Sequence, residues 1–563
     1  MNKKGFDMKK FLSKIEENKE FIFEIIAIIV IAMFSFSIAP KTLQNDTFYT
    51  VSIGNLIKEN GVDMKDHFSW HKDLPYTYPH WLYDVIMSSI YNIGEAKLPG
   101  GGWQAIYISV CVTSFLLGIT IYEVNRKLTG NKFVSFVLAA FSMYLLKDYI
   151  TARAQLVTFV IYMMVIYFIE KFIQNPKKFY YGIGIILSSI LIANLHVAVW
   201  PFLFVISLPY IAEYLICIFA DILIYRKINV LINKAKLKFF KKNIEKVNKI
   251  KNDLEQIEIS NEKRKQHREN EEVYKIKMKR NGNVKWLIVV MLICALTGFL
   301  TPLGTTPYTY LIKTMQGNTT ANINEHLPLT LINNVPIMCA IVIIIAVLTF
   351  TKTKIRLSDL FMIGGLCYLM FSSKRQSTMF ILFGSIILNR LITGALEIYG
   401  MGNVKKISKK LINIYTVGIA VAVIMFYSVK FTDDKKESPY VSKNSYPVEA
   451  AEWMLENLDV NNIKLFNEYN YGSYLLYKGI PVFIDSRADL YSPEFNNGED
   501  IFMDFINTSN MGKYYGSTFE KYGITHIILY KNAKIAMIID KTEPENYDKI
   551  YSDKNFVIYQ VVK

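Results

Sequence analysis

The chain has 563 residues, of which 52% are hydrophobic, and a mean hydropathy of +0.22. These values exclude an ordinary soluble enzyme and indicate a multi-pass membrane protein, because several apolar runs approach the ~20 residues that span a bilayer. The formal net charge is +16, and the segment from Arg226 to Arg280 contributes +10 of it, with 18 Lys and Arg against 8 Asp and Glu. All five cysteines fall in apolar runs, which argues against a disulfide framework and a cysteine-based zinc site.

Apolar runs predict eleven transmembrane helices. They cover residues 21–39, 103–123, 133–149, 155–173, 179–195, 197–224, 285–303, 335–350, 357–372, 376–393 and 411–430. The first run follows the basic stretch "MNKKGFDMKKFLSK" and has the flanks of a signal peptide, but its length favours an uncleaved anchor.

The orientation follows from Lys and Arg, which favour the cytoplasmic side in short loops. Basic residues gather at the N-terminus and in alternate loops, including the segment 225–284, so we expect these on the cytoplasmic side. The loops 40–102 and 304–334 and the C-terminal part then lie outside. Asp46, which follows the first span, is therefore predicted to be extracytoplasmic.

Four basic residues interrupt the otherwise sparse charge of the short outer turns: Lys147, Arg153, Lys374 and Arg375. One interpretation is that they snorkel to the interface. The other is an anion site at the membrane surface, because a charge at bilayer depth costs ~2.5–3.5 kcal/mol or more and usually has a partner.

The outer loop 40–102 is rich in His, Trp, Tyr and Pro. Its stretch 80–93 is apolar on one face but too short to span, which predicts an interfacial helix lying along the membrane. Three histidines near carboxylates raise the question of zinc, but one loop can hold such residues by chance. A loosely held divalent cation on Asp46 and a second carboxylate is the favoured alternative.

The loop also carries a set of ordered motifs. "NDTFYTVSIGNLIKENGVDMKDHFSW" followed by "YPHWLYDVIMSSIYNIG" resembles the first outer loop of GT-C superfamily membrane glycosyltransferases, in particular a bacterial branch distantly similar to protein O-mannosyltransferases and aminoarabinose transferases. The matching residues are Asp46, Gly54, Asp66, Phe68, Ser69, Trp81, Leu82 and Asp84.

The resemblance continues along the chain, except in the segment 225–284. "TARAQ" is similar to the family's "RPQ" with Ala154 in place of proline, and "LIANLHVAVW" to its "WANLHG". "INEHLPL" is similar to "EW.P", and "SSKRQSTMF" to "RH" with Gln376 in place of histidine. Outside, "LFNEYNYGSYLLYKGIPVFIDSRADLY" is similar to "FN.Y.WGGYL" and "VFIDGR.D.Y", with Ser486 in place of glycine.

The resemblance implies inverting transfer of a sugar from a polyprenyl-phosphate donor to a glycan, lipid or protein acceptor on the outer face. An inverting displacement needs a carboxylate that takes the acceptor proton and a cation for the departing phosphate. Asp46 is the expected base, and Glu325 and Asp148 are rivals for a second carboxylate. Arg153 and Arg375 are the expected phosphate ligands, because a guanidinium holds two phosphate oxygens.

Other candidates for substrate contacts are weaker. Lys374 is a third cation, and the side chains expected to make polar contacts to donor or acceptor are His80, Asn194 and His196. A lone histidine such as His196 is also a common packed structural residue.

The tail 431–563 predicts a small extracytoplasmic α/β domain, with strands in "IKLFNEY", "IPVFID", "THIILY" and "NFVIYQVV". Asp485, Arg487 and Asp489 follow an apolar strand, where such domains often bind ligands. Two roles stay open for the Asp485 and Arg487 pair: acceptor recognition, or fixing the loop against the membrane domain.

The expected fold is therefore a polytopic α-helical membrane protein with four regions. These are the module 1–224, a basic insertion 225–284, the helices 285–430, and the domain 431–563. The insertion predicts a pair of helices whose positive charge can lie on anionic lipid headgroups; nucleic acid is not an expected partner, because the charges are mixed. A non-catalytic scaffold or a lipid-linked-glycan transporter is the alternative function.

Overall fold

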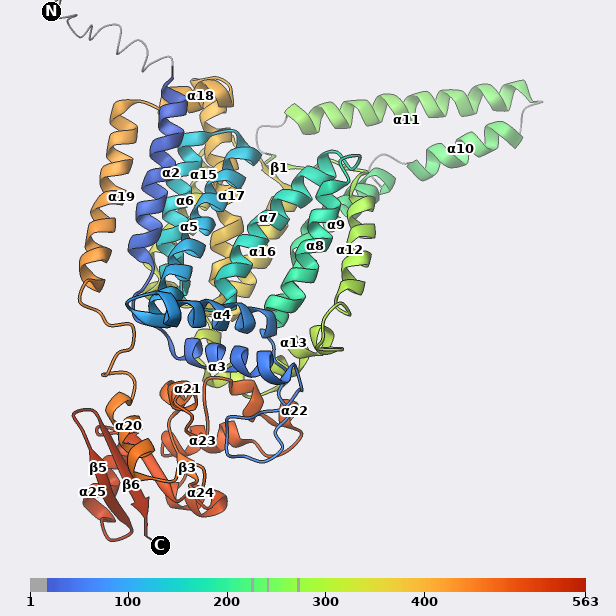
Figure 1. Cartoon of the computed structure of the whole chain (residues 1–563). Helices are drawn as coiled ribbons and strands as arrows, with labels where there is room; N and C mark the ends of the chain where they lie inside the picture. Colours follow the sequence, from blue (N-terminus) through green and yellow to red (C-terminus); the bar gives the residue numbers. More distant parts are fainter. Residues whose placement is uncertain (1–17, 224–226, 240–242, 271–273, 563) are drawn as a thin grey trace, which may run out of the picture.

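The computed structural model describes residues 18–223, 227–239, 243–270 and 274–562. The basic stretch 1–14, used above to predict the orientation, lies outside these residues. Within them, eleven apolar helices form one bundle, and each coincides with one predicted span (Figure 1). They are α2 (Lys19–Ile38), α5 (Gly101–Thr129), α6 (Lys132–Leu146), α7 (Ala154–Gln174), α8 (Tyr180–Leu195), α9 (Phe202–Leu223), α12 (Val284–Thr297), α15 (Val335–Phe350), α16 (Leu357–Ser372), α17 (Ser377–Leu396) and α19 (Ile414–Lys435).

Length and composition support a membrane position for this bundle. Six of the described helical segments are long and apolar enough to cross a membrane, namely Lys19–Ile38, Gly101–Thr129, Ala154–Gln174, Val197–Ala220, Lys374–Gly400 and Ile414–Lys435. The shorter apolar helices α8, α12, α15 and α16, together with α6, complete the bundle beside them. The chain is therefore a multi-pass membrane protein with a mostly helical fold.

Two helices of the outer loop lie across one end of the bundle (Figure 1). Helix α4 (Trp81–Lys97) confirms the predicted interfacial helix, whereas α3 (Asn45–Asn60) was not predicted from the sequence. The two pack so closely that a Cβ atom on Gly54 would lie 2.0 Å from the Asp84 carbonyl oxygen. Only glycine therefore fits at this crossing.

Short elements surround the same end of the bundle. They are η1 (Lys147–Tyr149), η2 (Val197–Val199), α13 (Thr306–Gln316), α14 (Thr319–Asn322), η3 (Asn324–His326), η4 (Leu331–Asn333) and η5 (Lys374–Gln376). The other end carries α18 (Val404–Leu411), η6 (Glu397–Met401) and the parallel pair β1 (Ile276–Lys277) and β2 (Ile355–Arg356).

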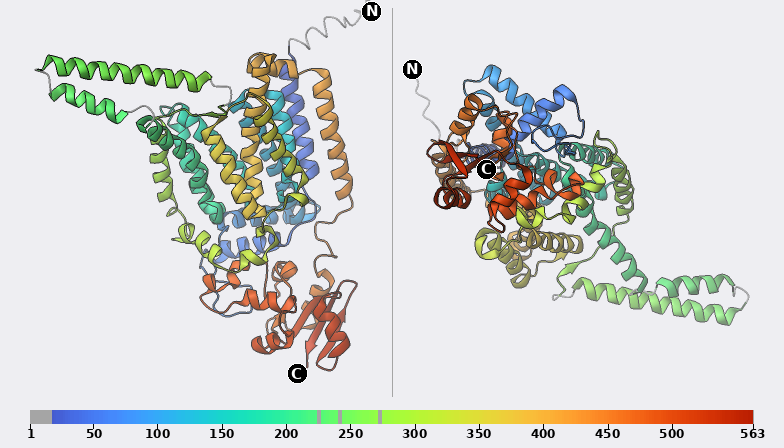
Figure 2. Two further views of the ribbon diagram at one scale, coloured as in Figure 1. Left: turned by 180° about the vertical axis from the view of Figure 1, so that it is seen from behind. Right: turned by 90° about the horizontal axis from the view of Figure 1, so that it is seen from below.

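The insertion forms two helices, as predicted. Helices α10 (Lys227–Phe239) and α11 (Ile244–Asn270) pack against each other and extend sideways from the end opposite α3 and α4 (Figures 1 and 2).

The C-terminal region is a small α/β domain that lies below α3 and α4 in Figure 1. Its sheet has the order β3-β4-β6-β5; β3 and β4 are parallel, and the other two pairs are antiparallel. The strands are β3 (Leu465–Phe466), β4 (His526–Tyr530), β5 (Tyr547–Ser552) and β6 (Phe556–Val561). The helices are α20 (Val448–Asn457), α21 (Tyr469–Tyr477), α22 (Pro493–Asn496), α23 (Ile501–Ser509), α24 (Tyr515–Tyr522) and α25 (Lys534–Thr542), with η7 (Ala488–Tyr491) between α21 and α22.

One predicted strand is wrong. The run "IPVFID", residues 480–485, joins no strand of this sheet and instead forms an isolated parallel bridge between Val482 and Ser69 of the outer loop. The backbone hydrogen bonds of Val482 join it to Phe68 and Trp70, at 3.2 Å each. The apolar run is buried as expected, but its partner is a loop about 400 residues away in the sequence.

The domain and α3 share one hydrophobic core. Phe48 of α3 is fully buried and makes edge-to-face contacts with Trp103, Tyr446 and Tyr474, at centroid distances of 4.9–5.1 Å. Such aromatic pairs are worth ~0.5–1.5 kcal/mol each beyond the burial of their area. The C-terminal domain is thereby fixed against the end of the bundle.

Candidate active site

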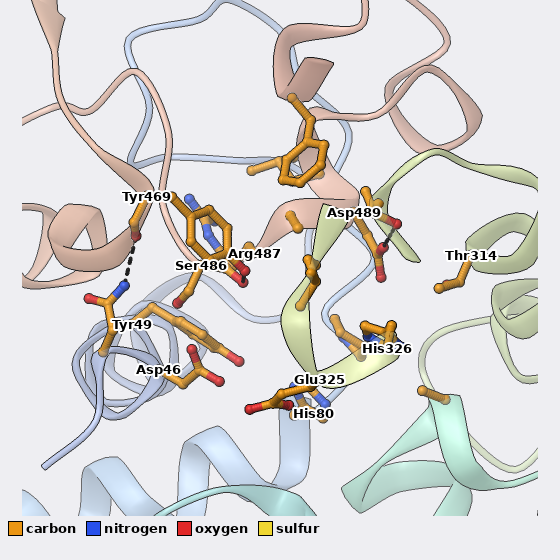
Figure 3. A pocket seen from close by; sticks show the side chains of 18 of the residues that line it. Asp46, Tyr49, His80, Thr314, Glu325, His326, Tyr469, Ser486, Arg487 and Asp489 are labelled. Carbon is orange, nitrogen blue, oxygen red and sulfur yellow. Dashed lines mark hydrogen bonds between the residues drawn. The ribbon is translucent and has the colours of Figure 1, made fainter. Parts of the chain in front are cut away.

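A cavity of about 740 Å³ lies between the end of the bundle and the C-terminal domain (Figure 3). Its walls come from α3, α4, the turns that precede α7 and follow α8, the segment around η3, and the loop that follows residue 485. Seven of the residues predicted as site residues line it: Asp46, His80, Arg153, His196, Glu325, Arg375 and Arg487.

Asp46 stands in the first turn of α3, where the partial positive charge of the helix N-terminus stabilises a carboxylate. Its Oδ2 atom lies 2.8 Å from Nε of Arg153. The Nη1 atom of the same guanidinium donates to both oxygens of Glu325, at 2.9 and 3.1 Å. One arginine therefore bridges two carboxylates that belong to different loops.

This bridge faces the cavity. The side chains of Asp46 and Arg153 are 18% and 25% exposed, so both can be reached from the open space. Burial alone would raise the pKa of Glu325, but Arg153 and Arg375 outweigh burial and hold this pKa below its ordinary value. Glu325 is therefore ionised at neutral pH.

Arg375 is the second cation in the wall. Within the part of the chain that the structure describes, no carboxylate oxygen lies within 4 Å of its guanidinium, in contrast to Arg153. Such a guanidinium, lining a cavity without a carboxylate partner, is suited to hold an anion such as phosphate.

Three histidines lie beside this arginine. The rings of His80 and His196 are 4.8 Å apart, and Nδ1 of His196 is buried without a hydrogen-bond partner among the described residues. Burial, followed by Arg375, lowers the pKa of His80 to about 3 and that of His326 to about 4. These imidazoles are neutral at pH 7 and serve as hydrogen-bonding groups.

The C-terminal domain adds acidic and aromatic groups to the cavity. Burial raises the pKa of Glu468 to about 7, and Asp489 accepts a 2.6 Å hydrogen bond from Tyr310. The backbone oxygen of Tyr469 accepts a 2.9 Å hydrogen bond from the side chain of Asn45, which fixes the domain beside Asp46 (Figure 3).

Several of these residues were missed as site residues from the sequence. His326 directly follows Glu325, and Glu468 and Tyr469 stand inside the motif "LFNEYNYG", so adjacency to recognised residues was the available signal. Tyr49 follows Asp46 by about one turn of helix but could not be placed there before α3 was known.

Four predicted residues do not line the cavity, namely Asp148, Lys374, Asn194 and Asp485. Asp148 is 78% exposed, pairs with Lys147 at 2.8 Å and does not line the cavity. Lys374 does not line the cavity. Asn194 also has a structural position, because its side chain accepts from Nε1 of Trp81 at 3.1 Å and donates to the Leu300 carbonyl at 3.0 Å.

Asp485 and Arg487 form a buried ion network instead of an open binding site. Arg487 borders the cavity, but its guanidinium bonds Asp485 at 2.7 and 2.9 Å and Asp66 at 2.6 Å. Tyr491 completes the network with a 2.6 Å hydrogen bond to Asp485. Since Asp66 belongs to the outer loop, the network fixes this loop against the C-terminal domain, and Asp485 is not accessible to a substrate.

The described residues contain no cluster of three His, Cys, Asp or Glu side chains that could hold a metal ion. His67 lies 2.6 Å from Asp63 of the same outer loop, and Nε2 of His71 lies 2.9 Å from the carbonyl of Phe483 in the C-terminal domain. These two histidines therefore hold the outer loop in place. Asp46 and Glu325, the pair suited to a divalent cation, are both bound to Arg153.

Comparison with solved structures identifies the architecture. The archaeal oligosaccharyltransferase AglB from Archaeoglobus fulgidus, in complex with an inhibitory peptide and a dolichol-phosphate, is similar with a TM-score of 0.53 and 12% identity, over 92% of this chain and 71% of that chain. ArnT from Cupriavidus metallidurans in the apo state is similar with a TM-score of 0.51 and 9% identity, over 96% of this chain and 97% of that chain. No family model and no curated protein sequence matches the chain.

Proposed function

We propose that this chain, which has the GT-C fold, is a membrane glycosyltransferase that moves a sugar from a polyprenyl-phosphate donor to an acceptor hydroxyl. The observation that carries the proposal is the cavity at the end of the bundle, in which a carboxylate, Asp46, lies beside Arg153 and shares the cavity wall with Arg375. A lipid tail can stay in the bilayer while its headgroup enters this cavity. AglB, which shares the fold, was solved with dolichol-phosphate, and this supports a lipid-phosphate donor.

Asp46 serves as the general base. Its Oδ2 is held by Arg153, while Oδ1 has no hydrogen-bond partner among the described residues and is free to take a proton. As Oδ1 accepts the proton of the acceptor hydroxyl, the acceptor oxygen bonds to the anomeric carbon from the face opposite the leaving group. The bond from this carbon to the phosphate oxygen breaks, and the anomeric configuration inverts.

Arg375 stabilises the phosphate that leaves with the bonding electrons. A guanidinium that is already oriented in a partly dry cavity needs little reorganisation when negative charge develops. Arg153 contributes positive potential from the other side, although its Nε and Nη1 atoms face Asp46 and Glu325. The neutral His80, His196 and His326 then provide hydrogen bonds to sugar hydroxyls without adding charge.

The residues present do not fit a dedicated divalent cation. A cation between Asp46 and Glu325 would have to displace the guanidinium of Arg153, and two carboxylates alone give few of the oxygen ligands that Ca²⁺ or Mg²⁺ requires. The mechanism therefore assigns the electrostatic role to Arg153 and Arg375.

The cavity faces the extracytoplasmic side in this proposal, because basic residues gather in the loops at the other end of the bundle. A cysteine introduced at Ser517, which is exposed on α24, should react with an impermeant maleimide added to intact cells. Protection of this cysteine until the membrane is permeabilised would reverse the orientation.

The deciding experiment incubates the purified protein in proteoliposomes with a panel of radiolabelled polyprenyl-phosphate sugars. Transfer to an added acceptor, or slow release of the sugar to water, supports the transferase. Binding of the panel without turnover would support a non-catalytic scaffold, and movement of the intact donor between leaflets would support a transporter.

A further inference from the structure

The helical hairpin formed by α10 and α11 has two different apolar faces. On α11, five partly buried positions recur at heptad spacing and face α10: Val247, Ile250, Leu254, Ile257 and Asn261, with partly buried Ser260 beside the last. On α10, the partly buried positions are Val230, Asn233 and Leu237. These two stripes form the seam of a short coiled coil.

Helix α10 carries a second apolar stripe that the seam does not use. Its members are Ile228, Leu231, Ile232 and Ala235, and all four are exposed, Leu231 at 66%. With ~100° per residue, these four positions fall in an arc of about 100° that lies opposite the seam. The stripe therefore points directly away from α11.

Lysines flank this stripe on both sides. Lys234 and Lys238 lie along one edge of the arc, and Lys236 lies along the other; all three are exposed. An apolar face bordered by lysines is typical of a helix that lies in the interface of an anionic membrane, where the long lysine stems reach up to the phosphates.

The position of the hairpin in the molecule is suited to contact between the apolar stripe of α10 and the membrane. In Figure 1 and in the left view of Figure 2, α10 lies on the side of α11 nearer to the middle of the bundle, at the level where α7, α8 and α9 end. Because α11 covers α10 from the side away from the bilayer, the exposed stripe faces the bilayer. The lysines then stand at the depth of the lipid headgroups.

We infer that α10 is an in-plane membrane anchor whose apolar stripe enters the leaflet at this end of the bundle and whose lysines bind anionic lipid headgroups. The charged helix α11 covers α10 on the aqueous side. This anchor is independent of the proposed sugar transfer, because it lies at the end of the molecule opposite the cavity.

The test uses the full-length protein, with its five cysteines replaced by alanine, in lipid nanodiscs. A nitroxide is attached at Ala235→Cys, in the middle of the stripe, or at Asn252→Cys, a matched exposed site on the face of α11 away from α10. Power-saturation EPR compares collision with oxygen, which concentrates in lipid, and with a water-soluble nickel complex. In nanodiscs of phosphatidylglycerol and phosphatidylcholine, we expect the oxygen-to-nickel ratio to be at least about fivefold higher at position 235 than at position 252.

The charge contribution is tested by replacing Lys234, Lys236 and Lys238 with glutamine. Each lysine near an anionic surface contributes about fivefold to the partitioning of a helix onto the membrane. The partitioning of α10 should therefore fall about 100-fold in the triple variant, and the label at position 235 should then lie in water. Nanodiscs of phosphatidylcholine alone should have the same effect. Equal oxygen-to-nickel ratios at positions 235 and 252 in the anionic nanodiscs would overturn the inference. So would a ratio at position 235 that changes neither with the lysine replacements nor in phosphatidylcholine nanodiscs. Dipolar broadening between labels at position 235 would assign the stripe to a second copy of the chain instead.

Discussion

Asp46→Asn is the substitution that tests the proposed mechanism most directly. Asparagine has nearly the same shape as aspartate and can occupy the same place beside Arg153, whose Nε lies 2.8 Å from Oδ2 in the ion pair. The amide, however, cannot take a proton from an acceptor hydroxyl at neutral pH. The change therefore removes the base while it keeps the packing of the first turn of α3.

The magnitude follows from the two roles of the carboxylate. A positioned general base contributes ~10²–10⁴-fold to the rate, which corresponds to about 3–5 kcal/mol of barrier. The cost to folding is smaller, about 1 kcal/mol, because Asp46 is partly exposed and Arg153 keeps its two hydrogen bonds to Glu325. We expect kcat to fall by at least 100-fold while the thermal unfolding temperature shifts by only a few degrees.

The assay follows transfer from the active polyprenyl-phosphate sugar under single-turnover conditions in proteoliposomes. Asp148→Asn is the matched control, because this substitution removes the same charge at the same end of the bundle. Asp148 itself is exposed and lies outside the cavity. Its rate should stay within about twofold of the unchanged protein. Full activity of Asp46→Asn, or an equal loss in both variants, would refute the assignment of Asp46 as the base.

Three further predictions follow from the same geometry. Arg375→Gln should lower kcat/KM about 100-fold through the loss of phosphate stabilisation, whereas Lys374→Gln should change kcat/KM less than about twofold. Steady-state kinetics with varied donor concentration measures both values, and an equal fall in the two variants would contradict the role of Arg375. Burial raises the pKa of Glu468 from 4.5 to about 7, so the protonated form contributes stability that is present below about pH 4.5 and lost as the pH rises through 7. The thermal unfolding temperature of the unchanged protein should therefore decline between pH 5 and 8, and that of Glu468→Gln should not. An equal decline in both proteins would exclude Glu468 as its source. Arg487→Met leaves Asp485 buried without its cation and should destabilise the protein by about 3–5 kcal/mol, measured as faster proteolysis of the C-terminal domain; unchanged proteolysis would show that the buried ion network does not hold the domain.

The transmembrane helices could be predicted closely because a bilayer demands a minimum apolar length, and the sequence shows that length directly. Helix α3 could not be predicted for the opposite reason. Its residues 47–51 are all buried, since α4 covers one side and the C-terminal domain another, so no apolar periodicity marks a single face. The run 480–485 has the apolar composition of a buried strand, but the sequence does not show that its pairing partner is Ser69 of the outer loop.

For the site, too, the sequence predicts which residues take part but not which of them are in contact. Asp46, Arg153 and Glu325 could each be proposed from charge, side of the membrane and motif, but their mutual contact joins positions up to 172 residues apart in one pair. Asp148 stands five residues before Arg153 in the sequence but pairs with Lys147, whereas Glu325 pairs with the Arg153 guanidinium. Proximity along the chain to Arg153 favours Asp148, whereas the folded loops bring Glu325 to the guanidinium.

The arrangement also explains why the membrane helices and the C-terminal domain act as one unit. The side chain of Asn45 donates to the backbone of Tyr469, and Phe48 packs against Tyr446 and Tyr474, so both flanks of Asp46 are held by the C-terminal domain. A carboxylate must be positioned to within about 0.5 Å to serve as a base. The domain therefore sets the position of the proposed base on a helix that belongs to the membrane module, even though the base itself lies more than 380 residues before that domain begins.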